Sequence, residues 1–108
     1  MKPFELYISY ISWGYDGKHR PVLVFSLKKE MTFVYPITSQ YENKSEAIQE
    51  KYFEIIDWSQ AGLTKRSYVD TRNYIPIPIH NIKNRKPIGV LSLKDKHRFL
   101  RFLYNKNL

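Results

Sequence analysis

The alternation of apolar and polar residues predicts a strand at the start of the chain. Residues 4–12 place Phe4, Leu6, Ile8 and Tyr10 on one side of an extended backbone, with more polar residues between them. A period of two over such a length is typical of a strand that buries one face and leaves the other exposed.

Further strand candidates follow, separated by turns that contain glycine or charged residues. The segment WGYDGK forms the first turn, and a proline opens the apolar run after it. Proline is tolerated at the first position of a strand because it need not donate a hydrogen bond there. The predicted strands cover residues 21–26, 31–39, 52–58 and 66–71. The segment YIPIPI, residues 74–79, alternates Ile with Pro and therefore suits an edge or extended segment better than a central strand.

The last part of the chain predicts a helix. The segment SLKD, residues 92–95, matches the capping box, in which a serine hydroxyl and an acid three residues later bond to the free N–H groups of the first turn. An apolar stripe follows on one side, and we expect the histidine in it to pack. The stripe consists of Leu93, His97, Leu100 and Leu103, with Phe99 and Phe102 beside it. Residues 41–51 are polar, and Ser45 is a candidate cap for a short helix among them.

Several short strands followed by one terminal helix predict a mainly β fold with a C-terminal helix. The simplest arrangement is a small, mostly antiparallel barrel with the helix packed against it. The length of 108 residues fits one domain, spanning residues 1–108. The sequence has no cysteine, no signal-peptide pattern and no apolar stretch approaching the roughly 18 residues that span a bilayer. We therefore expect a cytoplasmic protein without a membrane partner.

The positive charge is confined to one half of the chain. The formal net charge is +8, and residues 55–108 carry all of this excess, since residues 1–54 balance to zero. A basic surface attracts polyanions, because phosphates bind it and release counterions. The charge raises the odds of a nucleic-acid partner, although a solvated basic surface would give the same balance.

The residue types exclude several kinds of catalytic site. Without cysteine there is neither a thiolate nucleophile nor a Cys-based zinc site. The three histidines and the scattered acids of the second half lack metal-ligand spacing, and no glycine-rich phosphate loop is visible, so we expect no metal and no cofactor. Only His19 is a candidate for proton transfer, because it directly precedes Arg20.

A metal-free site of arginine, histidine and hydroxyl groups can still cleave RNA. The substrate's own 2′-OH is the nucleophile, so the protein needs only to orient the phosphate, stabilise its charge and move protons. A guanidinium matches a phosphate bidentately. Arg20 precedes the apolar run of its strand, and Thr38 and Ser39 end the next strand. A hairpin would bring the three side chains to the same end of the sheet.

These residues resemble the MazF/PemK family of toxin endoribonucleases. The resemblance lies in Arg20-Pro21-Val22-Leu23-Val24, followed by Pro36-Ile37-Thr38-Ser39 at the end of the next strand. It continues in the same order along the chain, from about residue 5 to residue 103. The further matching segments are Phe53-Glu54-Ile55, Gly62-Leu63, Ser67-Tyr68-Val69, Ile88-Gly89, Leu91 and Asp95.

The resemblance implies a small SH3-like barrel and a two-fold homodimer. It also implies metal-independent cleavage of single-stranded RNA, such as mRNA, and inhibition by a cognate antitoxin protein. The family's catalytic arginine and threonine correspond to Arg20 and Thr38. Their neighbours and a second polar pair are candidate RNA contacts: Lys18, Ser39, Arg72 and Asn73.

Two other functions fit the same residues. One is a nucleic-acid-binding barrel without catalysis, because a fold does not fix an activity. The other is a topoisomerase poison of the CcdB type. Arg20 could also be a solvated charge at a strand end, with its aliphatic stem packed and its head in water.

Overall fold

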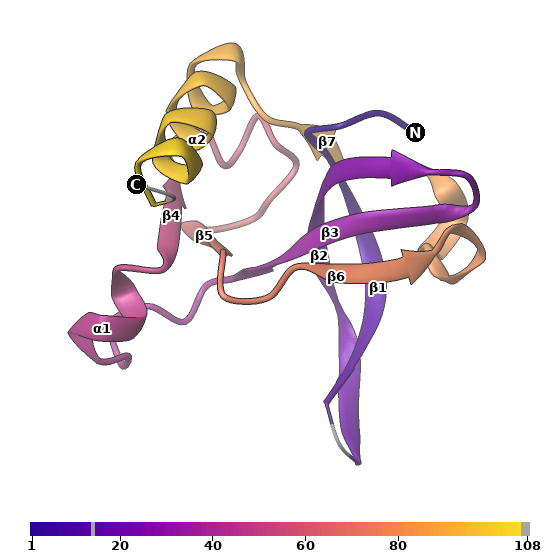
Figure 1. Ribbon diagram of the computed structural model, residues 1–108, viewed down its shortest axis with the longest axis horizontal. Coiled ribbons are helices and arrows are strands. Elements are labelled where there is room, and N and C mark those ends of the chain that lie inside the picture. Colours follow the sequence, from indigo (N-terminus) through magenta and orange to yellow (C-terminus); the bar gives the residue numbers. More distant parts are fainter. Residues whose placement is uncertain (14, 107–108) are drawn as a thin grey trace.

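The computed structural model describes residues 1–13 and 15–106. It is a half-barrel of antiparallel strands with a helix at the C-terminal end (Figure 1). The strands pair in the order β4-β5-β3-β2-β1-β7, and β6 pairs with β3. The mainly β architecture with a terminal helix confirms the fold predicted from the sequence. In this part of the chain, no helix is long and apolar enough to cross a bilayer.

The elements follow the predicted order with shifted boundaries. The strands are β1 (Glu5–Trp13), β2 (Asp16–Lys28), β3 (Met31–Thr38), β4 (Tyr52–Ile55), β5 (Ser67–Asp70), β6 (Ile75–Pro78) and β7 (Gly89–Val90). The helices are α1 (Glu46–Gln49) and α2 (Leu93–Lys106), with two 3-10 turns, η1 (Ile79–Asn81) and η2 (Lys83–Arg85), between β6 and β7. Ser45 caps α1 as expected, because its hydroxyl oxygen accepts from the N–H of Ile48 at 3.3 Å.

The strand after the first turn is longer than predicted. It begins at Asp16, so Arg20 and Pro21 lie inside β2, where they pair with Ser9 and Ile8 of β1. The hydrophobic pattern gave no signal for residues 16–20 because they form a two-stranded hairpin with β1 and are mostly exposed. We call residues 10–13 and 15–19 the hairpin arm; it projects from the body of the half-barrel (Figure 1).

The central strands are buried on both faces. One core cluster contains Leu23 and packs under α2, and a second contains Val22 and Val24 and lies on the opposite side of the sheet. The run from Val22 to Phe25 therefore alternates between two cores, which explains why it reads as continuously apolar. The half-buried pattern predicted for β1 is wrong for the same reason: Tyr7 is fully buried, whereas Tyr10 is 50% exposed.

Helix α2 is anchored by a buried carboxylate. The Ser92 hydroxyl oxygen accepts from the N–H of Asp95 at 3.1 Å, as the capping box predicts. The Asp95 carboxylate, however, accepts from the backbone N–H groups of Ile56 at 3.3 Å and Asp57 at 2.8 Å, beyond the end of β4. It also accepts from Arg98 Nη1 at 2.7 Å. The acid thus ties the helix to the sheet rather than closing the cap reciprocally.

The orientation that Asp95 imposes changes which side of α2 is buried. Phe99, one turn after Asp95, is fully buried, while His97 is exposed and Leu93 is 68% exposed. The prediction that His97 packs in the core is therefore wrong, because the buried side of the helix is centred on Asp95 and Phe99 instead of on the predicted stripe.

We predict that Asp95→Ala lowers the free energy of unfolding by at least about 2 kcal/mol. The substitution leaves the backbone N–H groups of Ile56 and Asp57 without this acceptor, and each such group costs roughly 1–3 kcal/mol; Arg98 loses its carboxylate partner but keeps its bond to the Glu54 carbonyl. Urea unfolding measures the difference. The control is Glu54→Ala, which removes an exposed ion pair with Arg66 at 3.8 Å and should cost less than about 1 kcal/mol. Equal losses for the two variants would contradict the anchoring role of Asp95.

Candidate functional site

A cleft opens where β2 and β3 part. The ladder between these strands has its last pair at Val22 and Pro36; beyond it β2 continues into the hairpin arm, and Ile37 and Thr38 of β3 pair with β5. The space between the diverging strands is a pocket of about 400 Å³. It is closed on a third side by the segment before β5. Its lining is Lys18, His19, Arg20, Pro21, Ile37, Thr38, Ser39, Gln40, Leu63, Thr64, Lys65 and Ser67.

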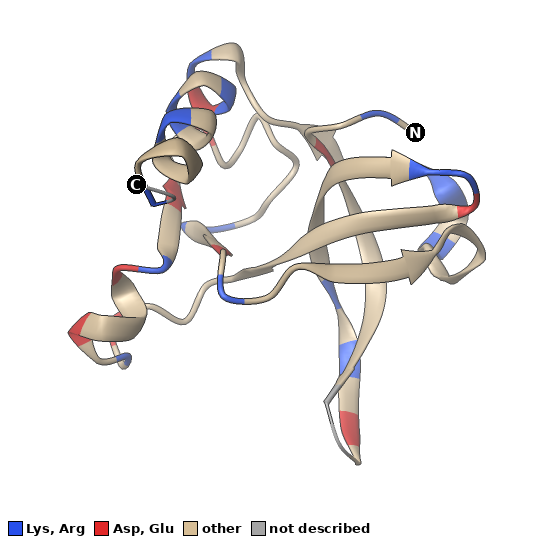
Figure 2. Cartoon of the chain, in the orientation of Figure 1, with Lys and Arg blue, Asp and Glu red and all other residues tan. Residues whose placement is uncertain are grey.

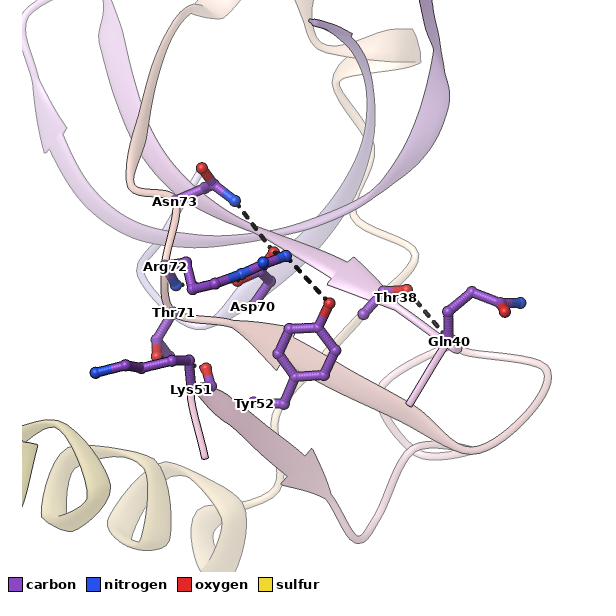
Figure 3. Close-up of polar contacts among 8 residues, drawn as sticks. All are labelled: Thr38, Gln40, Lys51, Tyr52, Asp70, Thr71, Arg72 and Asn73. Carbon is purple, nitrogen blue, oxygen red and sulfur yellow. Dashed lines mark hydrogen bonds and ion pairs between the residues drawn. The ribbon is translucent and has the colours of Figure 1, made fainter. Parts of the chain in front are cut away.

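The lining of the cleft is cationic and rich in hydroxyl groups. Lys18, Arg20 and Lys65 supply the charge, and each charged residue of the lining is a cation. The Thr38 hydroxyl oxygen accepts from the N–H of Gln40 at 3.0 Å (Figure 3). An accepting hydroxyl still carries its own proton, so this bond orients Thr38 as a donor to a further group. The cleft can therefore bind an anion through charge and through O–H donation.

A second polar cluster lies beside the cleft. The Asp70 carboxylate accepts from Arg72 Nε at 3.1 Å, from Arg72 Nη2 at 3.0 Å and from Asn73 Nδ2 at 3.1 Å (Figure 3). Asp70 also accepts from the backbone N–H of Arg72 at 3.0 Å. Arg72 Nη2 in turn donates to the Tyr52 hydroxyl at 3.3 Å. We call Tyr52, Asp70, Arg72 and Asn73 the Asp70 cluster.

Charged residues of both the cleft and the Asp70 cluster affect the pKa of the Tyr52 hydroxyl. Burial raises the pKa of the Tyr52 hydroxyl above its usual value, and the Asp70 charge raises it further. Arg72 and Arg20 act in the opposite direction and lower this pKa, so Arg20 lies within electrostatic range of the cluster. The net upward shift keeps the phenol protonated at neutral pH. Hydrogen bonding to Asp70 raises the pKa of Arg72, which keeps its guanidinium charged.

The structure brings most of the predicted site residues together. Lys18, His19, Arg20, Thr38 and Ser39 all line the cleft. Arg72 and Asn73 are held in the Asp70 cluster through their hydrogen bonds to the Asp70 carboxylate. Within residues 1–13 and 15–106, no group of three or more His, Cys, Asp or Glu side chains is placed to hold a metal ion.

Several residues of this region were missed in the sequence. Tyr52, Asp70 and Ser67 lie in predicted strands, and Thr64 and Lys65 lie between two of them, so the strand pattern gives none of these residues a role in the site. The segment Asp70-Thr71-Arg72-Asn73 did carry a signal, because an aspartate that accepts from the N–H two residues later forms an Asx turn. No such local signal shows that the segment before β5 lies close to β2.

The positive charge is spread over the molecule rather than gathered at the cleft. Figure 2 shows the Lys and Arg residues of the second half along α2, between β5 and β6, and between β6 and β7, with others of the first half at the turn between β2 and β3 and on the hairpin arm. The basic second half of the sequence therefore does not form a single face. The local charge of the cleft comes from Lys18 and Arg20 of the first half together with Lys65 of the second.

The architecture is similar to that of a known toxin. No protein-family model matches the chain, and no curated protein matches it in sequence. Among solved structures, the chain is similar to the Mycobacterium tuberculosis toxin MazF-mt6, with a TM-score of 0.69 and 21% sequence identity, over 94% of this chain and 93% of that chain. The fold is MazF-like. The structural likeness covers nearly the whole of both chains.

Proposed function

We propose that this chain is the toxin of a type II toxin-antitoxin system and cleaves single-stranded RNA without a metal ion. The observation that carries the proposal is the cleft itself, where Arg20 of β2 and Thr38 of β3 line one pocket. The MazF-like fold supports the same function. The proposed assembly is a homodimer, and the proposed regulator is a cognate antitoxin protein.

The proposed reaction uses a nucleophile from the substrate. The RNA 2′-oxygen attacks the adjacent phosphorus and loses its proton, while the 5′-oxygen of the next nucleotide leaves and gains one. The products are a 2′,3′-cyclic phosphate and a 5′-OH. The protein contributes by orienting the phosphate, stabilising the charge that develops on it and moving the two protons.

The lining of the cleft suits these tasks. The Arg20 guanidinium donates two hydrogen bonds to the non-bridging phosphate oxygens, which is the geometry that arginine provides and lysine does not. The Thr38 hydroxyl, oriented by the N–H of Gln40, donates a third. Lys18 and Lys65 act as point charges for flanking phosphates, with Ser39 as a further donor. His19 is the candidate for proton transfer.

The Asp70 cluster has a supporting role in this proposal. Its carboxylate already accepts hydrogen bonds from Arg72 and Asn73, which makes it a poor base for the 2′-OH. It holds Arg72 at the edge of the RNA path instead, and the protonated Tyr52 hydroxyl lies beside that guanidinium. Arg72 and Asn73 are then RNA contacts outside the reacting phosphate.

The first test is cleavage in the presence of a chelator. We expect the purified protein to cut a long single-stranded RNA in excess EDTA and to leave ends with 2′,3′-cyclic phosphate and 5′-OH groups. End mapping and phosphatase sensitivity identify both. Activity that disappears with EDTA and returns with magnesium would overturn the metal-free mechanism, and inhibition of gyrase without any RNA cleavage would favour the topoisomerase poison.

The second test separates catalysis from binding. Arg20→Ala and Thr38→Ala should each slow cleavage of bound RNA at least about tenfold, equivalent to about 1.4 kcal/mol of barrier. Thr38→Ser keeps the hydroxyl and should retain most of the rate. Arg101→Ala, which removes an exposed arginine from α2, is the charge-matched control. If His19→Ala lowers the cleavage rate as much as Arg20→Ala does, the imidazole transfers a proton. If Arg20→Ala cuts RNA at the wild-type rate, the proposed mechanism is wrong.

The third test asks which cations touch phosphate. Lys65→Ala should make the salt dependence of RNA affinity less steep by about 0.7 on a log–log plot, because one phosphate contact on a single strand is lost. Lys29→Ala removes the same charge from the turn between β2 and β3, at the end of β3 remote from Thr38, and should leave the slope unchanged. Fluorescence anisotropy with a labelled, non-cleavable RNA measures both slopes. Equal slopes for the two variants would contradict the placement of RNA in the cleft.

A further inference from the structure

The hairpin arm carries an aromatic ring that is both exposed and held in place. Tyr10 is 50% exposed, although it lies in a strand whose earlier residues are buried. It faces His19 across the two strands, with ring centroids 5.5 Å apart and the planes at 69°. Edge-to-face pairs of this kind are a favoured aromatic arrangement and fix the relative orientation of the rings.

A glycine on the opposite strand provides the space for the Tyr10 ring. A Cβ atom at Gly17 would lie 2.6 Å from Tyr10 Cζ and would also clash with the phenolic oxygen. The ring tip therefore lies directly over the Gly17 backbone, with His19 beside it. Glycine weakens a strand because it contributes no side chain to pack. In this two-stranded arm, the main effect of Gly17 is that it leaves room for the Tyr10 ring.

The position of this ring relates it to the cleft. His19 touches Tyr10 on one side and lines the cleft on the other, next to Arg20. His19 and Gly17 cover the ring only in part, since Tyr10 is 50% exposed, and over residues 10–13 and 15–19 no third strand is paired with β1 and β2. Arg20 pairs with Ser9 and so lies on the other face of the arm from Tyr10, but the edge of β2 is open where β3 has left it, and an RNA strand held at Arg20 can cross this edge beside His19 and bring a neighbouring nucleotide to the Tyr10 ring.

We propose that Tyr10, seated over Gly17 and beside His19, is a base-stacking platform for a nucleotide that flanks the scissile phosphate. Exposed aromatic rings next to a cationic groove are the usual way in which proteins hold single-stranded nucleic acid, because every base presents a π-face. The platform fixes the register of the RNA in the cleft and leaves the chemistry to Arg20 and Thr38. This inference rests on the proposed function.

The test compares two tyrosines of the same arm. Tyr10→Ala should weaken binding of a single-stranded RNA that spans the mapped cleavage site, made non-cleavable by 2′-O-methylation, by at least about fivefold. Tyr10→Phe keeps the ring and should bind within about twofold of the wild type. Tyr15→Ala removes the fully exposed tyrosine at the tip of the arm and is the matched control, with no expected loss.

A kinetic measurement distinguishes the platform from a catalytic or purely structural role. In single-turnover cleavage of the unmodified RNA, Tyr10→Ala should raise the protein concentration needed for half-maximal rate at least fivefold and leave the maximal rate within about threefold. A 2-aminopurine placed at the flanking positions should be quenched on binding to the wild type and to Tyr10→Phe, but not to Tyr10→Ala. Circular dichroism confirms that the variants are folded.

The outcomes separate this inference from the proposed function. If the wild type cleaves RNA but Tyr10→Ala binds as tightly as the wild type, the platform is wrong and the endoribonuclease stands. If Tyr10→Ala and Tyr15→Ala lose affinity equally, the arm contributes general contact and the platform is again overturned. If the wild type neither binds nor cleaves RNA, the proposed function fails and the platform fails with it.

Discussion

The site depends on the point at which β2 and β3 stop pairing. Both strands carry a proline there, Pro21 in β2 and Pro36 in β3, and neither proline has an N–H to donate to a ladder. The ladder therefore gains little by continuing, and the two strands take different partners: β2 stays with β1 in the hairpin arm, and β3 turns to β5. A cleft between strands of one sheet exposes residues of both faces, which is how consecutive residues such as His19, Arg20 and Pro21 come to line it together. The same divergence leaves the arm, with Tyr10 on it, open beside the cleft.

The sequence predicted the elements whose signals are local and failed where the deciding contact is distant. Alternation and turn residues located the strands, and Ser45 and Ser92 identified the starts of both helices. The buried side of α2 was predicted wrongly because the Asp95 carboxylate accepts from backbone groups 38 and 39 residues earlier in the chain. A polar residue that is fully buried outweighs an apolar stripe, since its unmade hydrogen bonds would cost more than the exposure of Leu93.

The candidate site likewise combines residues that local signals identify with residues that only distant contacts bring in. Arg20, Thr38 and their neighbours could be named from the sequence because they flank two strands joined by a short turn, and a hairpin brings such residues to one end. Lys65 could not be named from the sequence, because it reaches the cleft only when the segment before β5 folds back against β2. Tyr52 is separated from Arg72 by 20 residues and meets it only through the pairing of β4 with β5. Long-range strand pairing, not composition, decides which polar residues join the site.

The cleft and the projecting arm differ in how closely their residues are tied to the packed core. Arg20, Thr38 and the Asp70 cluster lie where β2, β3 and β5 leave the packed core, so a change in their positions would disturb Val22, Ile37 or Val69. Of the arm residues whose side chains the structure describes, Ile11 is the one that belongs to the core, at 8% exposed, and exposed residues such as Tyr15 can change with little cost to the fold. If the proposed function holds, the residues proposed to bind phosphate are tied to the core, whereas the exposed residues proposed to contact the flanking bases lie on the arm, where substitution disturbs the core less.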